Sequence, residues 1–353
     1  IGNSLNILSE TPEHCKQIHI SQPVLTLKMF KKLKNQEVFG YRCQILQAKF
    51  SAKGEPGDLE NGVKALCRSA EQAVKLGYNV LVISDRITDK QYAPIPTLLA
   101  TAAVQHHLIA KRLRTKTGII VEAGDAWETH HFATLVGYGA SAVYPYLAFE
   151  SLISLKNEGK LSENLDIEQA IDNYIYAIGY GLLKIMSKMG ISTLQSYQGS
   201  QIFEALGISK DVIDKCFTGT ISRIEGISFD GIAKEVLCRH QVAFKYDKDK
   251  GKRLDMGGFY QWKRTGEFHL LNPDTIHLLQ HSTRRNDYSL YKKYANFIND
   301  QTKNACTLRG LFEFKERKSI SLDEVEPKEA ILKRFATGAM SFGSISHEAH
   351  TTL

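Results

Sequence analysis

Two short polar segments carry the side chains best suited to chemistry, and each directly follows a continuous apolar run. Asp85 and Arg86 follow the run at residues 80–83, and Glu122 and Asp125 follow the next such run. Continuous apolarity predicts strands buried on both faces, which is the pattern of a parallel sheet. The carboxyl ends of parallel strands are where active sites are built. A structural role fits these residues equally well, with Asp85 and Asp125 capping the helices that follow and pairing with Arg86 or its neighbours.

The elements around these two segments alternate between strand and helix, which predicts an α/β fold with parallel strands. The pattern does not by itself separate a closed barrel from an open doubly wound sheet. The expected elements are a helix over 59–74 that ends near Gly77, strands at 80–83, 118–122 and 142–144, and helices from 96 to 108 and from 127 to 136.

The second half of the chain is more helical and ends in less regular sequence. We expect a long helix over 167–189, a short strand at 190–194, helical pieces at 201–206 and 211–216, a helix over 232–244, loops over 245–288 and a helix over 289–303.

Composition excludes several classes of function. The net charge of +7 is scattered over the chain and forms no basic stripe interleaved with aromatic residues, so a nucleic-acid partner is disfavoured. The six cysteines are far apart without any CxxC pair, which disfavours a zinc or iron–sulfur site in this chain. The sequence has no signal-peptide pattern and no apolar run long enough to span a bilayer. We therefore expect a soluble protein from a reducing compartment, without a membrane partner.

Two apparent motifs are better explained by structure than by ligand binding. Gly137, Gly139 and Ala142 fit G-x-G-x-x-A, but a dinucleotide site needs a strand before the glycines and a helix after them. Here the predicted order is reversed, so we interpret the glycines as a helix stop and turn. The histidine pairs at 106–107 and 130–131 are adjacent residues that diverge around a helix, and neither pair can readily hold one metal ion.

The last residues of the chain have the composition of a new domain rather than of a terminus. Residues 337–346 are almost all small or apolar, as in a buried strand end that something flat could approach. We expect this chain to be a piece of a longer polypeptide.

Taken together, phrases along the whole chain resemble the large subunit of glutamate synthase. They occur in the order of that family from near Ile1 to Leu353. The matching phrases are Glu10 to His14, Leu81 to Arg86, Ala93 to Ala100, His130 to Ala133, Gly137 to Ala140, Val143 to Ala148, Met186 to Thr193, Ser196 to Gly199, Thr307 to Leu311 and Arg334 to Ser346.

The resemblance implies a place in a multidomain enzyme. The family joins a glutaminase domain, a central domain, an FMN-binding barrel with an iron–sulfur cluster, and a β-helix. Residues 1–326 would be the central domain, and 327–353 a linker and the truncated start of the FMN-binding barrel. The central domain is implied to be a degenerate (β/α) barrel related to FMN-linked oxidoreductases, without its own flavin. The family's nucleophilic cysteine belongs before Ile1 and its cluster cysteines after Leu353, so we expect no catalytic residue, metal or cofactor in this chain.

The implied function is that of a scaffold and ammonia-conduit wall. The whole enzyme would make L-glutamate from L-glutamine and 2-oxoglutarate with electrons from reduced FMN. Ferredoxin or a small subunit that uses a pyridine nucleotide would be the partner, in the cytoplasm or the plastid stroma. The flavin would lie against Gly338, Ala339, Met340 and Ser341 in the full-length enzyme only. The alternative is a self-sufficient barrel that binds FMN or a phosphate at the strand ends near Asp85 and Asp125.

Overall fold

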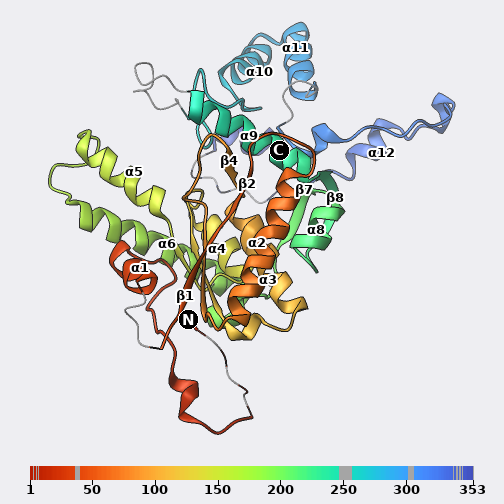
Figure 1. The fold of residues 1–353 in the computed structure, drawn as a ribbon. Helices are drawn as coiled ribbons and strands as arrows, with labels where there is room; N and C mark the ends of the chain where they lie inside the picture. The colour runs from red at the N-terminus through yellow and green to blue at the C-terminus, as the bar shows by residue number, and fades with distance from the viewer. Residues whose placement is uncertain are drawn as a thin grey trace. The chain divides into compact units, whose positions relative to one another are not determined.

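The structure is a computed structural model, and its contacts divide the chain into two compact units, Ile1–Lys250 and Gly251–Leu353. The first unit contains an α/β core and the second is mostly helical (Figure 1). The structure describes residues 1–353 except 3, 5, 7, 36–39, 246–256, 301–305, 337, 339, 340, 342, 344 and 353.

The core of the first unit is a four-stranded parallel sheet. Its strands, in spatial order, are β1 (Cys43–Gln47), β3 (Val80–Ser84), β5 (Gly118–Glu122) and β6 (Ala142–Tyr144). Every residue of β3, β5 and β6 is buried, which explains why these strands are apolar throughout rather than alternating. The predicted α/β class with parallel strands is therefore confirmed.

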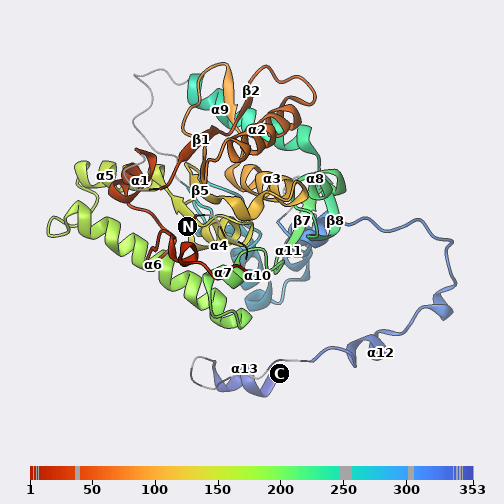
Figure 2. The same ribbon diagram turned by 60° about the horizontal axis from the view of Figure 1, so that its bottom comes forward.

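The strands are added to the sheet in one direction, without a reversal of order. The connections contain α2 (Asp58–Lys75), α3 (Thr97–Ala110) and α4 (Thr129–Gly137), and neighbouring members of this helix layer pack against each other (Figure 2). Beyond β6, Val24 forms a parallel bridge with Val143. Among the described residues no ladder joins β1 to this far edge, so the strands form an open sheet and not a closed barrel.

Shorter elements surround the sheet. β2 (Lys49–Ser51) pairs antiparallel with β4 (Tyr92–Pro94), and both follow the carboxyl ends of core strands. α1 (Leu27–Lys34) packs on β1, and its Phe30 ring stacks on Tyr144 at 4.5 Å between centroids. α5 (Tyr146–Asn157) directly follows β6. The short 3-10 helices in this unit are η1 (Pro12–Cys15) and η2 (Arg114–Lys116).

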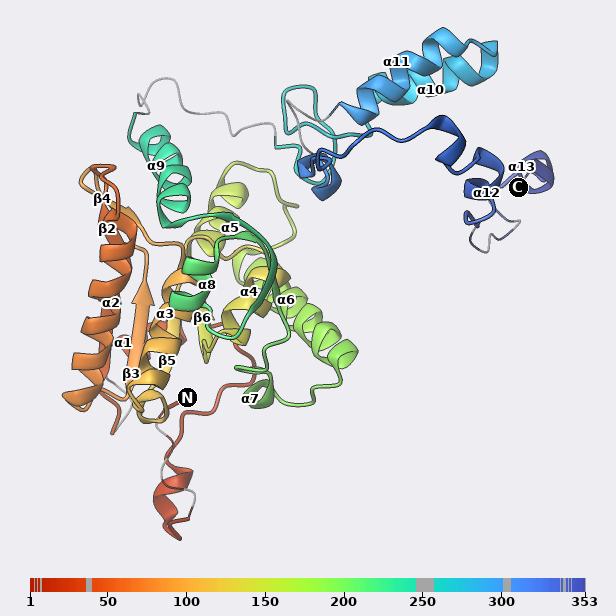
Figure 3. The same cartoon turned by 90° about the vertical axis from the view of Figure 1, so that its right-hand side faces the viewer.

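The longest helix, α6 (Ile167–Met189), has the bounds that the sequence predicts. The Asp166 side chain accepts a hydrogen bond from the Gln169 amide at its start. Gly190 adopts a φ of 70° at its end, and glycine carries no steric penalty there. α6 packs on α4 and α5 (Figure 3).

The segment after α6 differs from the prediction. Residues 190–194 form no strand, and α7 (Leu194–Tyr197) begins at their end. Residues 201–206 are not helical, because β7 (Glu204–Ile208) pairs there with β8 (Ile221–Ile227) in a separate two-stranded parallel sheet. The expected helices at 211–216 and 232–244 are confirmed as α8 (Lys210–Cys216) and α9 (Phe229–Lys245).

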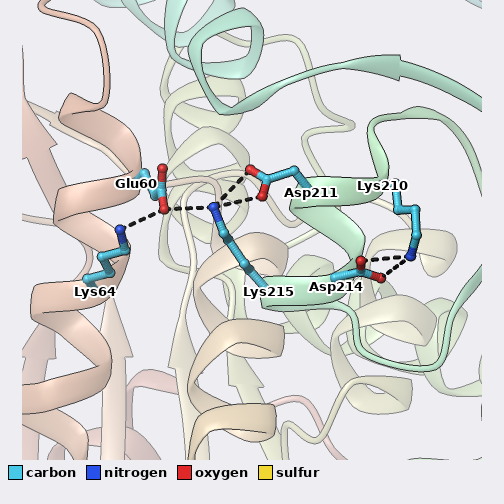
Figure 4. A network of polar contacts seen from close by, with 6 residues as sticks. All are labelled: Glu60, Lys64, Lys210, Asp211, Asp214 and Lys215. Atoms are coloured by element: carbon cyan, nitrogen blue, oxygen red, sulfur yellow. Dashed lines mark hydrogen bonds and ion pairs between the residues drawn. The ribbon is translucent and has the colours of Figure 1, made fainter.

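A network of charged side chains links α8 to α2 of the helix layer (Figure 4). Lys215 Nζ lies 2.9 Å from Glu60 Oε1 on α2 and 2.7 Å from Asp211 Oδ1 on α8. Lys64 shares the same Glu60 oxygen at 2.7 Å. Because these side chains are partly exposed to water, burial of Val212 and Cys216 contributes more to stability than the charges do.

The second unit contains a helical hairpin, α10 (Pro273–Arg285) and α11 (Tyr288–Asn299), whose two helices pack on each other. Asn272 forms a capping box with Thr275, and Asn286 turns the chain with a φ of 50°. α11 confirms the start of the helix predicted over 289–303 but ends at Asn299, and residues 301–303 of that prediction lie outside the described residues. α10 lies in a segment predicted as loop. The remaining elements are η3 (Leu308–Leu311), η4 (Leu322–Glu324), α12 (Lys328–Leu332) and α13 (His347–Thr352).

Candidate functional site

The carboxyl edge of the parallel sheet gathers the polar side chains of the two segments that the sequence singled out. Ser84 and Glu122 are the last residues of β3 and β5 and lie in register. The Ser84 hydroxyl donates a hydrogen bond to Glu122 Oε2 at 2.7 Å. Glu122 is almost fully buried and has lost its contact with water. The hydrogen bond from Ser84 compensates part of this loss. The positive charge of Arg86, which lies 3.7 Å from Glu122 Oε1, compensates another part.

Asp85 at this edge is a buried carboxyl with a strongly raised pKa. It is 7% exposed, and its Oδ2 accepts a hydrogen bond from the Gly124 amide at 2.8 Å. Its Oδ1 is buried and has no hydrogen-bond partner within the described residues. Burial, and next the negative charge of Asp125, raise the pKa of Asp85 to about 7. Asp85 can therefore hold a proton near neutral pH.

Asp125 has a structural role. One of its oxygens accepts from the Thr97 amide at 3.0 Å, and the other accepts from the Thr97 hydroxyl. Thr97 is the first residue of α3, so Asp125 satisfies an amide that the helix itself leaves without a partner. The expected capping of a following helix is therefore wrong for Asp125, because the helix that it caps, α3, precedes it in sequence. Within the described residues Asp85 caps no helix either, and it accepts from the Gly124 amide instead.

Arg86 lies at the exposed rim of this edge. Its guanidinium donates to Glu150 at 2.7 Å and stacks on the Tyr146 ring at 4.4 Å. Tyr146 also bonds to Asp85, and its pKa is raised by burial and by the charge of that carboxyl. Neither Tyr146 nor Glu150 was identified from the sequence. The only available signal was that both directly follow β6, whose carboxyl end reaches the same edge.

This arrangement is suited to holding protons and unsuited to holding phosphate. Four carboxyl groups gather at this edge (Asp85, Glu122, Asp125 and Glu150), and the guanidinium of Arg86 lies near two of them, those of Glu122 and Glu150. Two backbone amides that an anion could use, those of Gly124 and Thr97, already donate to carboxylates. A phosphate group would meet net negative charge and occupied donors.

The two apparent motifs have structural explanations. Gly137 ends α4, Gly139 turns the chain with a φ of 105°, and β6 follows, so the order is helix, turn and strand as expected. His107 bonds to Glu71 at 2.8 Å, and His131 forms a capping box with Glu128. In the described part of the chain, no group of three histidine, cysteine or acidic side chains is arranged to hold a metal ion.

The segment predicted to meet a flavin is only partly described. Gly338 and Ser341 are exposed and lie outside any helix or strand. A Cβ atom at Gly338 would meet open space. Ala339 and Met340 lie outside the described residues, so the assignment of these four residues to a flavin site stays a prediction.

Residues 1–209 match the family model described as the glutamate synthase central domain, and residues 269–353 match a conserved region in glutamate synthase. The chain belongs to the glutamate synthase family. The resemblance seen in the sequence is thereby confirmed.

Similarity to relatives in this family extends over the whole chain. This chain is 45% identical to the glutamate synthase [NADPH] large chain of Bacillus subtilis, and the match covers 100% of this chain and 23% of that relative. It is 40% identical to the glutamate synthase [NADH] of Schizosaccharomyces pombe, of which it covers 17%. It is also 40% identical to the ferredoxin-dependent glutamate synthase 1, chloroplastic/mitochondrial, of Arabidopsis thaliana, of which it covers 22%. The chain therefore spans about a quarter or less of these relatives' length.

Similarity to solved structures is weaker. A flavocytochrome b2 variant with benzoylformate aligns with 50% of this chain and 37% of its own at 13% identity, with a TM-score of 0.33. An overlap of this size bears on neither fold nor function. None of the helices among the described residues is both long and apolar enough to cross a membrane.

Proposed function

We propose that this chain is the central part of a glutamate synthase, an oxidoreductase that makes L-glutamate from L-glutamine and 2-oxoglutarate. The observation that carries the proposal is the 45% identity that extends over the full chain while covering 23% of a glutamate synthase large chain. In this proposal, residues 1–326 form the central domain and residues 327–353 lead into the FMN-binding barrel.

The role of the chain in that enzyme is a scaffold and a wall of an ammonia conduit. Ammonia released in water would protonate and diffuse away, so two separated sites need an enclosed connection. A buried parallel sheet with a packed helix layer supplies rigid walls. The charge at its carboxyl edge disfavours the alternative of a barrel that binds FMN or phosphate near Asp85 and Asp125.

FMN and an iron–sulfur cluster would be bound by other parts of the complete enzyme, with Gly338, Ala339, Met340 and Ser341 against the flavin. A planar ring can approach the backbone closely only where side chains are small or point away. Ala339→Trp in the complete protein should abolish flavin content while leaving glutaminase activity intact, and Ala336→Trp serves as a control outside the four residues. Normal FMN content in the Ala339 variant would show that the assignment is wrong.

Electrons would come from ferredoxin or from a subunit that uses a pyridine nucleotide, because relatives of both kinds are similar to this chain at comparable identity. The protein would lie in the cytoplasm or in the plastid stroma, depending on the organism that it comes from.

The proposal is tested by comparing the complete protein with the 353-residue chain. The complete protein should form glutamate from glutamine and 2-oxoglutarate and should carry flavin absorbance. The isolated 353-residue chain should form no glutamate and should carry no flavin. Stoichiometric FMN in the isolated chain would favour the self-sufficient barrel, and a complete protein without glutamate formation would overturn the proposal.

A further inference from the structure

Two histidines of α10 lie one turn apart on the same side of the helix. His277 and His281 are four residues apart in sequence, a spacing that brings two side chains of a helix together. Their ring centroids are 4.0 Å apart, and the planes of the two rings differ by 36°. The sequence did not indicate this pair, because residues 245–288 were predicted as loops and the spacing has a meaning only on a helix.

The ring nitrogens of this pair are available to a ligand. His277 is exposed and His281 is half-buried. Neither ring has a hydrogen-bond partner among the described residues. His107 differs in this respect, because its ring bonds to the carboxylate of Glu71. The structural role that accounts for His107 therefore does not account for the two histidines of α10.

The separation of the two rings suits a single metal ion. A histidine nitrogen binds zinc at about 2.0–2.1 Å, so two nitrogens on one ion are at most about 4 Å apart. With centroids 4.0 Å apart, rotation of the side chains alone brings a nitrogen of each ring within this reach. The same spacing of two histidines on one helix holds zinc in the H-E-x-x-H motif. Because both residues belong to α10, the ion needs no ligand from another element.

The charges around the pair are mixed. Asp274 precedes His277 by three residues and lies on the same side of the helix, where it favours a cation. Arg284 and Arg285 follow in the last turn and oppose one. The pKa of His281 is lowered, first by the charge of His277 and then by burial and by the two arginines. The ring is therefore uncharged near neutral pH, and the uncharged ring is the form that binds a metal.

We propose that His277 and His281 together bind one divalent transition-metal ion, with water molecules in its remaining coordination positions. Imidazole ligands suit copper, nickel and zinc, and the affinity should be highest for Cu²⁺. Mg²⁺ and Ca²⁺ prefer oxygen ligands and should not bind here. A bound ion would link two successive turns of α10 and thereby stabilise the helix. The proposal departs from the absence of a metal expected from the sequence, and it does not depend on the glutamate synthase activity.

The first test is a titration of the complete protein with the Cu²⁺ complex of iminodiacetate, followed by electron paramagnetic resonance. The chelator occupies part of the coordination sphere of the copper and leaves room for two imidazoles. The wild type should show copper bound by two imidazole nitrogens. His277→Gln and His281→Gln should each weaken binding at this site at least about tenfold, because the paired imidazole acts at a high effective concentration. Equal copper binding by the wild type and both variants would overturn the proposal.

The matched control keeps two histidines on α10 and changes only their spacing. His281→Gln with Thr283→His places the second histidine six residues after His277. Six residues turn the helix by about 600°, so the two rings then point to different sides. This double variant should bind copper as weakly as His281→Gln alone. Binding as tight as in the wild type would show that separate histidines hold the copper, which would contradict a paired site.

The second test measures α10 itself by hydrogen exchange. Saturation with the copper complex should slow the exchange of the α10 amides in the wild type, because an ion that binds only the folded helix stabilises it. The same concentration should have no such effect on the double variant, and Mg²⁺ should have none on either protein. Unchanged exchange of α10 in the copper-saturated wild type would contradict binding across one turn of this helix.

Discussion

The Asp85 carboxylate accepts a hydrogen bond from the Gly124 amide at 2.8 Å and thereby links the loops that follow β3 and β5. The same carboxyl is buried, and its other oxygen has no partner among the described residues. Burial therefore makes the charged form of Asp85 costly, although the hydrogen bond from Gly124 by itself favours the charge. This relationship should make the stability of the folded protein depend measurably on pH.

Asp85→Asn should change how stability depends on pH. The pKa of Asp85 is about 7 in the folded protein and 3.8 for a free side chain. A pKa raised on folding gives stability that is complete below the unfolded value and is lost as pH rises to the folded value. From pH 4 to 7 the wild type should therefore lose up to about 4 kcal/mol relative to the variant, and the difference should level off above pH 7. Urea unfolding across this range measures it.

The control for this series is Glu163→Gln, which removes an exposed carboxylate from the loop before α6. It measures how much the loss of one carboxylate far from this edge changes the pH series. A flat difference for Asp85→Asn would mean that this carboxyl ionises normally.

Asp125→Ala should destabilise the protein by roughly 1–2 kcal/mol, because it leaves the first amide of α3 without an acceptor. Asp125→Asn keeps an acceptor oxygen and should therefore lose less stability than Asp125→Ala. The asparagine variant should also lower the pKa of Asp85, since the charge of Asp125 is one cause of its rise. Equal losses for the alanine and asparagine variants in denaturant unfolding would contradict the capping role.

Gly139→Ala should be more destabilising than Gly199→Ala. Both glycines have positive φ, 105° and 74°, so each substitution incurs backbone strain of order 1 kcal/mol. A Cβ atom at Gly139 would also overlap the Gln105 side chain, whereas one at Gly199 would meet open space. Thermal unfolding of the two variants measures the difference, and equal losses would show that Gln105 moves aside at no cost.

Lys215→Met should cost less than about 1 kcal/mol, because its contacts with Glu60 and Asp211 lie at the surface. The loss should shrink in 1 M salt, which screens exposed charges. A large loss that does not respond to salt would indicate that packing of the side chain over Phe229, 5.5 Å away, dominates instead.

Elements with an unambiguous local signal could be predicted from the sequence. β3 and β5 are continuous apolar runs, and such runs are buried on both faces whatever surrounds them. α6 has a capping aspartate before it and a glycine after it, and both of its ends lie where the sequence predicts them. The polar residues after β3 and β5 could be placed at one edge because parallel strands end together.

Elements that depend on distant partners could not be predicted. β1 contains Gln44 and Gln47, and only its pairing with β3 makes it a strand. β7 was mistaken for a helix because its five residues carry no clear period, and its pairing with β8 decides the outcome. The Asp85 site needs Gly124 and Tyr146, which are far apart in sequence, and no local pattern reports that contact.

The most direct test of the central claim follows nitrogen through the complete protein. Glutamine labelled with nitrogen-15 in its amide group is supplied with 2-oxoglutarate, a reductant and an excess of unlabelled ammonium. If this chain forms the wall of a conduit in a glutamate synthase, the new glutamate should carry the label almost undiluted. Glutamate labelled only in proportion to the mixed ammonium pool, or no glutamate at all, would contradict the account.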